Sequence, residues 1–256
     1  MEQIKLQQVK QIQEISISDD CYITHKLYTH KNKYDMIFSF YHTNNIPLIM
    51  SITKTKILLG TTITDNYKTL TFNATKVCKL QKNNNHSLSI NLVCKLIHHL
   101  SIQLKYLIEN YGKCFIGYSL TNVVVIDDNI FVYIPNNEDI CDIVDDNIMI
   151  THPFNHDDFY QTPETVSLSS IPSYIHYKTN YYSLACLIID LLKKESTIQL
   201  EKIEKIEKIE KIEQLEEFTL NTLNTLDTLL IKDSKLYYFL KRCLTKEAEK
   251  RSLLYI

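Results

Sequence analysis

The feature that most constrains the fold is the run Asn180–Leu192, which is apolar except for a few polar residues at its start and Asp190 near its end. Its length and composition predict a helix. Two further segments accompany it: Thr162–Glu164 precedes it, and Leu240–Arg251 follows it much later in the chain. Each segment is a weak signal alone, but the three in this order restrict the fold far more than any one of them.

The composition is that of a folded protein. The chain has 256 residues, of which 45% are apolar and 23% are charged, enough to bury the core of one large domain or of a two-lobed unit. Its formal net charge of −2 provides no general positive field, so nucleic acid is not expected as a partner. The abundance of Ile, Lys and Asn indicates an AT-rich coding sequence.

Glycine is scarce. The three glycines are Gly60, Gly112 and Gly117, and none of them lies in a Gly-x-Gly cluster. Glycine clusters allow a backbone to approach a phosphate closely, so the sequence contains no signal for a phosphate-binding loop.

Cysteine usage and hydropathy favour an intracellular, soluble protein. The seven cysteines are dispersed without a Cys-x-x-Cys pair, which predicts buried small hydrophobic residues in a reducing compartment. His152 and His156 flank Pro153, which argues against a helical metal site there. The N-terminus has no apolar signal core, and no stretch reaches the roughly 18 apolar residues of a membrane span. We therefore expect no metal and no membrane partner.

The first part of the chain is predicted to be rich in strands. Residues 2–14 have the pattern of a short polar helix. After them come short β-branched or aromatic runs separated by Asn, Asp and Thr, which predict an antiparallel sheet without an amphipathic helix. These runs are Tyr34–Phe40, Ile46–Ile52, Lys56–Leu59 and Tyr67–Phe72.

The second part of the chain is predicted to begin after the polar connector Lys82–His86. Leucines recur at spacings of three or four from Leu88 to Ile108 and stop before Gly112, which predicts a long helix with a glycine C-cap. Two apolar runs on either side of Asp127–Asn129 predict a hairpin. Residues 201–217 contain a Glu-Lys-Ile repeat and are predicted to be a charged helical insertion.

Three segments together resemble the C-terminal lobe of protein kinases. Thr162–Glu164 resembles the Ala-Pro-Glu that closes the activation segment, and Asn180–Ala185 resembles the Asp-x-Trp-Ser-x-Gly that opens a buried central helix. Leu240–Arg251 resembles the late Leu-x-x-x-Leu-x-x-Asp-Pro-x-x-Arg motif. The resemblance implies an α+β, two-lobed fold, with a small β-rich N-lobe at residues 1–85 and a larger, mainly helical C-lobe at residues 86–256.

The same resemblance implies a catalytic loop without its chemistry. Phe115–Asn122 occupies the place of the kinase His-Arg-Asp-Leu-x-x-x-x-Asn, whose Asp accepts the proton of the substrate hydroxyl. Gly117 stands at the Asp position and has no side chain to accept a proton. Asn122 matches the magnesium-binding Asn, and common turn chemistry explains it equally well. No Asp-Phe-Gly occurs in Tyr133–Asp139, where Glu138 and Asp139 are the only acids.

The nucleotide-binding half is equally poor in family residues. Ser51 occupies the place of the strand lysine, and no glycine precedes Gly60. Lys54 and Lys56 lie just beyond that place and are weak candidates for a phosphate contact, together with Asn122. The resemblance therefore implies that ATP and magnesium are not bound. If the chain does bind them, these three residues are the candidate contacts.

The residues that match the family are structural. Glu164 and Arg251 correspond to a Glu and a late Arg that form a buried ion pair, which holds two distant segments in register. Asn180 replaces an Asp that caps the catalytic-loop backbone, and Ser183 matches the family serine. Those replacements keep hydrogen-bonding capacity and lose charge.

The sequence therefore predicts a pseudokinase, of the divergent kind found in large DNA viruses with AT-rich genomes. Its expected role is that of a scaffold, decoy or regulator in the host cytoplasm, and its expected partner is a protein such as a kinase or a kinase substrate. Two alternatives stay open: an active atypical Ser/Thr kinase that uses displaced acids, and a structural, virion-associated protein.

Overall fold

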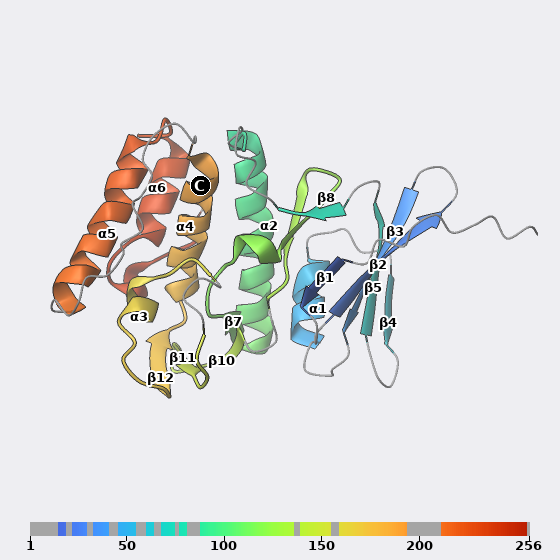
Figure 1. The fold of residues 1–256 in the computed structure, drawn as a ribbon, viewed down its shortest axis with the longest axis horizontal. Helices are drawn as coiled ribbons and strands as arrows, with labels where there is room; N and C mark the ends of the chain where they lie inside the picture. Colours follow the sequence, from blue (N-terminus) through green and yellow to red (C-terminus); the bar gives the residue numbers. More distant parts are fainter. Residues whose placement is uncertain are drawn as a thin grey trace, which may run out of the picture.

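The computed structural model describes residues 15–18, 22–29, 33–40, 46–54, 60–63, 68–74, 77–80, 88–135, 139–154, 159–193 and 211–254. The fold is mixed α+β, with antiparallel strand pairs in three sheets. A five-stranded sheet lies at one end of the molecule and most helices lie at the other (Figure 1). The predictions for residues 2–14, 56–59, 82–86 and 201–210 lie outside the described residues.

The five-stranded sheet has the order β1-β2-β3-β5-β4. Its members are β1 (Ile15–Ser18), β2 (Tyr22–Thr29), β3 (Lys33–Phe40), β4 (Gly60–Ile63) and β5 (Lys68–Ala74). The strands predicted from Tyr34 and from Tyr67 are confirmed by β3 and β5. In these two runs, the β-branched and aromatic residues predicted the strands correctly.

Helix α1 (Ile46–Thr53) corrects the prediction for the segment between β3 and β4. The sequence predicted a strand at Ile46–Ile52 and no amphipathic helix among the strands of this half, and both predictions are wrong. The buried residues include Leu48, Ile49 and Ile52, which share one helical face, and α1 packs against α2 (Ile90–Tyr111). A short apolar run fits a buried strand and a buried helix equally well, so the tertiary contact decides between them.

Helix α2 (Ile90–Tyr111) confirms the predicted long helix. The Ser89 hydroxyl accepts a hydrogen bond from the Leu92 amide at its start. Gly112 ends it with a φ of 59° and donates its amide to the Ile108 carbonyl. Glycine adopts this left-handed conformation without a Cβ penalty, which is why the helix ends there.

The predicted hairpin is also confirmed, by β8 (Val123–Ile126) and β9 (Ile130–Tyr133). Asp127 and Asp128 have φ values of 50° and 60°, which Asp tolerates better than most residues. Strand β6 (Val77–Lys79) pairs with β8 to complete a three-stranded sheet. One strand from the first part of the chain therefore belongs to the same sheet as the hairpin.

The third sheet has the order β12-β11-β10-β7. Its strands are β7 (Lys113–Phe115), β10 (Ile140–Val144), β11 (Asn147–Ile150) and β12 (Ser173–His176). The remaining helices are α3 (Pro163–Val166), α4 (Thr179–Leu192), α5 (Lys211–Thr228) and α6 (Lys235–Cys243).

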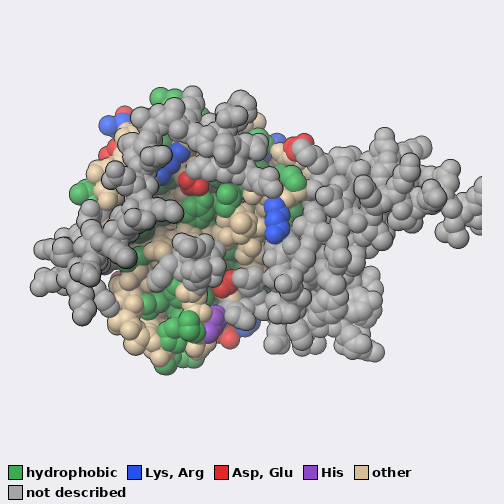
Figure 2. All heavy atoms as spheres, in the orientation of Figure 1, with side chains coloured by type: hydrophobic (Ala, Val, Ile, Leu, Met, Phe, Trp, Pro, Cys, Tyr) green, Lys and Arg blue, Asp and Glu red, His purple; other side chains and the backbone are tan. Residues whose placement is uncertain are grey.

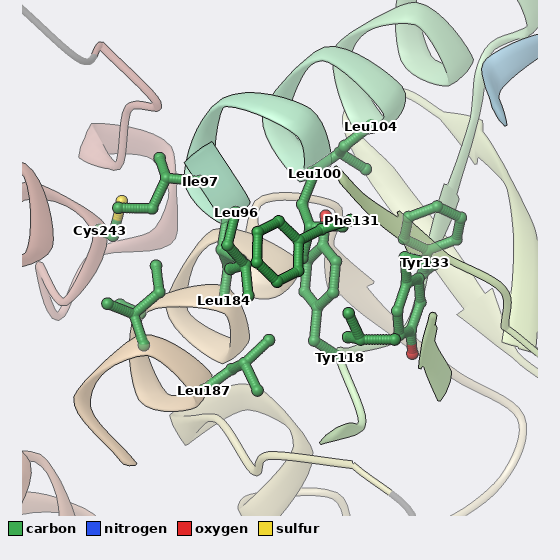
Figure 3. Close-up of a cluster of buried hydrophobic side chains, with 14 of the residues drawn as sticks. Leu96, Ile97, Leu100, Leu104, Tyr118, Phe131, Tyr133, Leu184, Leu187 and Cys243 are labelled. Atoms are coloured by element: carbon green, nitrogen blue, oxygen red, sulfur yellow. The ribbon is translucent and has the colours of Figure 1, made fainter. Parts of the chain in front are cut away.

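The apolar run Asn180–Leu192 forms helix α4, as predicted. Helix α4 lies in the core between α2, α5 and α6. Figure 3 shows Leu184 and Leu187 of α4 facing Leu96 and Leu100 of α2, with Phe131 beside them. All five side chains are fully or almost fully buried. A helix that is apolar around most of its circumference must be covered on most sides, and α4 satisfies that requirement.

Within the described residues, no helix is both long and apolar enough to span a bilayer. The described cysteines are all free thiols. Burial raises the pKa of Cys186 and of Cys243 to about 12, so both are protonated and unreactive at neutral pH. On the face drawn in Figure 2, the described Lys and Arg side chains are scattered among other residues.

Candidate functional site

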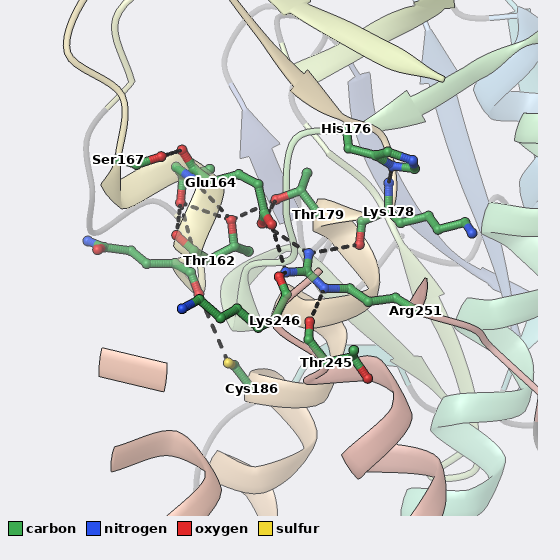
Figure 4. Close-up of polar contacts among 12 residues, drawn as sticks. Thr162, Glu164, Ser167, His176, Lys178, Thr179, Cys186, Thr245, Lys246 and Arg251 are labelled. Atoms are coloured by element: carbon green, nitrogen blue, oxygen red, sulfur yellow. Dashed lines mark hydrogen bonds and ion pairs between the residues drawn. The ribbon is translucent and has the colours of Figure 1, made fainter. Parts of the chain in front are cut away.

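Glu164 and Arg251 form the ion pair that the family resemblance implied (Figure 4). The Arg251 Nη2 lies 2.7 Å from Glu164 Oε1, and Nη1 lies 3.0 Å from Oε2. Two parallel N–H···O contacts make the pair bidentate, the strongest geometry available to an Arg and a carboxylate. The pair joins α3 to the end of the described chain, although nothing local brings these segments together.

The Arg251 guanidinium is almost completely enclosed, and the residue is 1% exposed. Its remaining donors reach the backbone carbonyls of Thr245, Lys246 and Lys178. Its guanidinium carbon lies 5.0 Å from the centre of the Tyr182 ring, close enough for a cation–π contact. A buried guanidinium needs this degree of hydrogen bonding to offset the loss of its hydration.

Three threonines beside Glu164 form hydrogen bonds that were not predicted from the sequence, although Thr162 belongs to the Thr162–Glu164 motif. Thr162 caps α3, and its hydroxyl accepts a hydrogen bond from the Thr165 amide while the Thr165 hydroxyl accepts from the Thr162 amide. The Thr179 hydroxyl donates to Glu164 Oε2 at 3.2 Å and lies 2.6 Å from the Thr162 hydroxyl. A Thr three residues before another Thr, with Pro at the first helical position, was the available sequence signal.

Asn180 and Ser183 of α4 hold the segment that precedes Asn122. The Asn180 side-chain amide donates to the Phe115 carbonyl at 3.2 Å. The Ser183 hydroxyl accepts from the Tyr118 amide at 2.8 Å and donates to the Tyr160 carbonyl at 2.7 Å. Both α4 residues are completely buried, so their side chains act as internal anchors of this loop.

Gly117 lies between Phe115 and Tyr118, whose backbone groups α4 holds, and its surroundings leave no room for a side chain. A Cβ placed on Gly117 would lie 2.7 Å from Phe159 Cδ2 and 3.1 Å from the Ser183 hydroxyl. Contacts this short force neighbouring atoms to move. The loop therefore has no acidic side chain at position 117, and the packing of Phe159 and Ser183 leaves no space for one.

Asn122 is buried in a 3₁₀ turn at Leu120–Asn122, directly before β8. The Asn122 backbone amide donates to the Ser119 carbonyl, and the Asn122 backbone carbonyl accepts from the Ile134 amide. The neighbouring Tyr133 hydroxyl donates to the Gly117 carbonyl at 2.8 Å and accepts from the Ser119 amide at 3.1 Å. Burial raises the pKa of Tyr133 far above its ordinary value, so this hydroxyl keeps its proton and fixes the loop.

Of the three candidate nucleotide contacts, the structure describes Lys54 and Asn122. Lys54 follows α1, and its ammonium lies 4.5 Å from the centre of the Tyr106 ring on α2. Ser51 belongs to α1, where its hydroxyl donates to the Leu48 carbonyl, so it is not at the lysine place of a strand. The Asp139 carbonyl accepts from the Ile116 amide, whereas Lys56 and Glu138 lie outside the described residues.

At the described places where the resemblance implies contacts to nucleotide and magnesium, Asn122 has a matching side chain, and it is buried. The described residues contain no group of three or more His, Cys, Asp or Glu side chains that could hold a metal ion. Compared with known proteins, the chain matches no family model and no curated sequence.

Proposed function

We propose that this chain is a catalytically inactive protein-kinase-like protein that acts by binding another protein. The observation that carries the proposal is the closed position at Gly117, where Phe159 and Ser183 fill the space next to the backbone. A phosphotransfer loop needs a side chain that positions or accepts the proton of the attacking hydroxyl. Glycine has no such side chain, and the packing around Gly117 leaves no space for a larger residue.

The retained framework supports a binding role. The Glu164–Arg251 pair and the Asn180 and Ser183 anchors keep α3, α4 and the loop at Phe115–Tyr118 in register. A buried ion pair contributes little net stability compared with an apolar core, so its retention fits a need for a defined surface. Under this proposal, the chain is a viral scaffold, decoy or regulator in the host cytoplasm, and its partner is a kinase or a kinase substrate.

Phosphotransfer and nucleotide binding test this proposal together. The purified chain is incubated with radiolabelled ATP, magnesium and a generic protein substrate, and its melting temperature is measured with and without ATP and magnesium. We expect no transfer and little thermal shift, since a ligand stabilises a fold in proportion to RT ln(1 + [L]/Kd). Gly117→Asp is expected to lower the melting temperature and to leave transfer absent.

Other outcomes would favour the alternatives. Magnesium-dependent transfer that Asn122→Ala abolishes would establish an active atypical kinase and refute the proposal. Enrichment in virus particles without any stoichiometric protein complex would instead establish a structural, virion-associated role.

A further inference from the structure

The outward face of β10, β11 and β12 carries exposed apolar side chains. Val144, Met149 and Tyr174 are 61%, 43% and 66% exposed. Met149 and Tyr174 lie directly opposite each other on paired strands, so their side chains share this face. In Figure 2, hydrophobic side chains gather at the lower end of the molecule, where Figure 1 places these three strands.

Strand β12 is also the end strand of its sheet, with a strand neighbour on one side only among the described residues. The Tyr177 amide donates to the Asp146 carbonyl in the register that continues from β12. Hydrogen-bonded and open positions alternate along an antiparallel pair, so the backbone groups of Ile175 face β11. The backbone groups of Tyr174 and His176 therefore point to the open side of the sheet, where another strand can pair.

A polar pocket of about 390 Å³ adjoins this face, and it shares Asn147 and His176 with the sheet. Its other lining residues are Asp145, Asp146, Tyr177, Lys178 and Glu249.

The pocket has an excess of acidic groups. Asp145, Asp146 and Glu249 supply three carboxylates, and Lys178 is the cation among the lining residues. The Lys178 ammonium donates to the Glu249 carbonyl at 2.7 Å. His176 accepts a hydrogen bond from the Lys178 amide, and burial lowers the pKa of its imidazole, which keeps it neutral at pH 7. Near neutral pH, the pocket therefore favours a cationic side chain.

We propose that β12 and this pocket dock an extended segment of a partner protein that carries a Lys or Arg. The segment adds to the open edge of β12 as an antiparallel strand, its apolar side chains cover Met149 and Tyr174, and its basic side chain enters the pocket. Because the pocket lies at the C-terminal end of β12, the basic residue precedes the apolar residues in the partner. This inference rests on the proposed binding function and specifies the chemistry of the partner.

A second copy of this chain fits the same surface poorly. Two β12 strands related by a two-fold axis pair antiparallel, which places the pocket of one copy beside the segment that precedes β12 in the other. That segment, Ser169–Pro172, contains no basic residue. Charge complementarity therefore favours a basic partner over self-association.

Peptide selection on the full-length chain tests the proposal. A displayed library of random nine-residue peptides is selected against the wild-type protein. Enriched peptides are then measured against an apolar variant, Tyr174→Ser with Met149→Ser, and against an acidic variant, Asp145→Asn with Asp146→Asn and Glu249→Gln. Asn tolerates the positive φ values of the Asp145–Asp146 turn, so the acidic variant keeps this backbone. Leu230→Ser and Glu247→Gln are matched controls outside the surface.

We expect enriched peptides to carry Lys or Arg before alternating β-branched or aromatic residues. Their affinity should fall at least tenfold in each variant and stay within twofold in the controls, with unchanged melting temperatures in all of them. A peptide N-methylated at alternate amides should lose binding to the wild-type protein, because it cannot pair with an edge strand.

Three outcomes would overturn the docking surface: no enrichment, binding that both variants leave unchanged, or binding that survives N-methylation. Self-association that Tyr174→Ser abolishes would also overturn it and would identify a second copy as the occupant. Each of these results leaves the phosphotransfer test untouched, so failure of this surface is distinguishable from failure of the proposed function.

Discussion

Breaking the Glu164–Arg251 ion pair is expected to destabilise the protein strongly. The two single substitutions, Glu164→Ala and Arg251→Ala, are expected to lower the free energy of unfolding by different amounts. Glu164→Ala leaves the guanidinium with the carbonyls of Thr245, Lys246 and Lys178 as acceptors. Arg251→Ala removes one donor from each of those carbonyls, of which the Lys178 carbonyl still accepts from the Tyr181 amide, and it removes one of the largest fully buried side chains. The Glu164 carboxylate that remains has the Thr179 hydroxyl as a partner and a side chain that is 17% exposed.

These contacts set the expected magnitudes. Removing one partner of a buried ion pair costs about 3–5 kcal/mol. We expect Glu164→Ala near the lower end, about 3 kcal/mol, because three acceptors still satisfy the guanidinium. Arg251→Ala should reach about 5 kcal/mol, since a cavity and the lost hydrogen bonds to three carbonyls add to the loss. The double variant should be less unstable than the sum of the singles by about 1.5–3 kcal/mol.

Urea unfolding of the four proteins measures this cycle. Asp142→Ala is the control, because it breaks an ion pair with Lys113 in which Asp142 is mostly exposed, and we expect it to cost under about 1 kcal/mol. A coupling free energy of zero between Glu164 and Arg251 would refute the argument that the pair holds α3 and the Arg251 segment in register. It would also remove the main structural support for the family resemblance.

Two further predictions concern His99, which is partly buried, and Tyr133, which is fully buried. Burial, followed by the charges of His98 and Lys95, lowers the pKa of His99 to about 4 from its ordinary value of 6.5, and its Nδ1 accepts a hydrogen bond from the Phe131 amide. The His99 imidazole binds a proton more tightly in the unfolded chain, so its contribution to the free energy of unfolding is complete above pH 6.5 and is lost as pH falls toward 4. Partial exposure of the side chain limits this contribution to about 1–2 kcal/mol. In urea unfolding at several pH values, His99→Gln should flatten this acid limb, and an unchanged slope would contradict the assignment. Tyr133→Phe leaves the Gly117 carbonyl and the Ser119 amide unpaired and should cost about 2–3 kcal/mol. Tyr238→Phe, which loses a 3.5 Å contact to Asp233, should cost little, and equal losses in the two variants would refute the role of the Tyr133 hydroxyl.

Several elements were predictable from the sequence because their signals are local. Helix α2 follows from leucine spacing with Gly112 behind it, and the β8–β9 hairpin follows from two apolar runs around Asp127–Asn129. Each of these signals comes from residues close together in the sequence, where helix capping and turn preferences decide the local structure. The Glu164–Arg251 pair was predictable only through the resemblance of three separate segments, because no local rule joins residues so far apart.

Other features had no readable signal. Ile46–Ile52 has the composition of a strand, and only its packing against α2 shows that Leu48, Ile49 and Ile52 share a helical face. The pocket beside β12 combines residues from Asp145 to Glu249, and its lining depends on how the β10–β11 turn lies beside the end of the described chain. Neither could be predicted without the tertiary contacts.

The sequence by itself determined that Gly117 has no side chain, that α4 must be buried, and that few glycines are present to approach a phosphate. These are properties of residue type, and they hold in any fold. Only the tertiary structure decided that the space beside Gly117 is filled by Phe159 and Ser183, and that Arg251 reaches Glu164 and three carbonyls. Packing and long-range hydrogen bonds join residues that are distant in the chain, and their geometry exists only once the chain has folded.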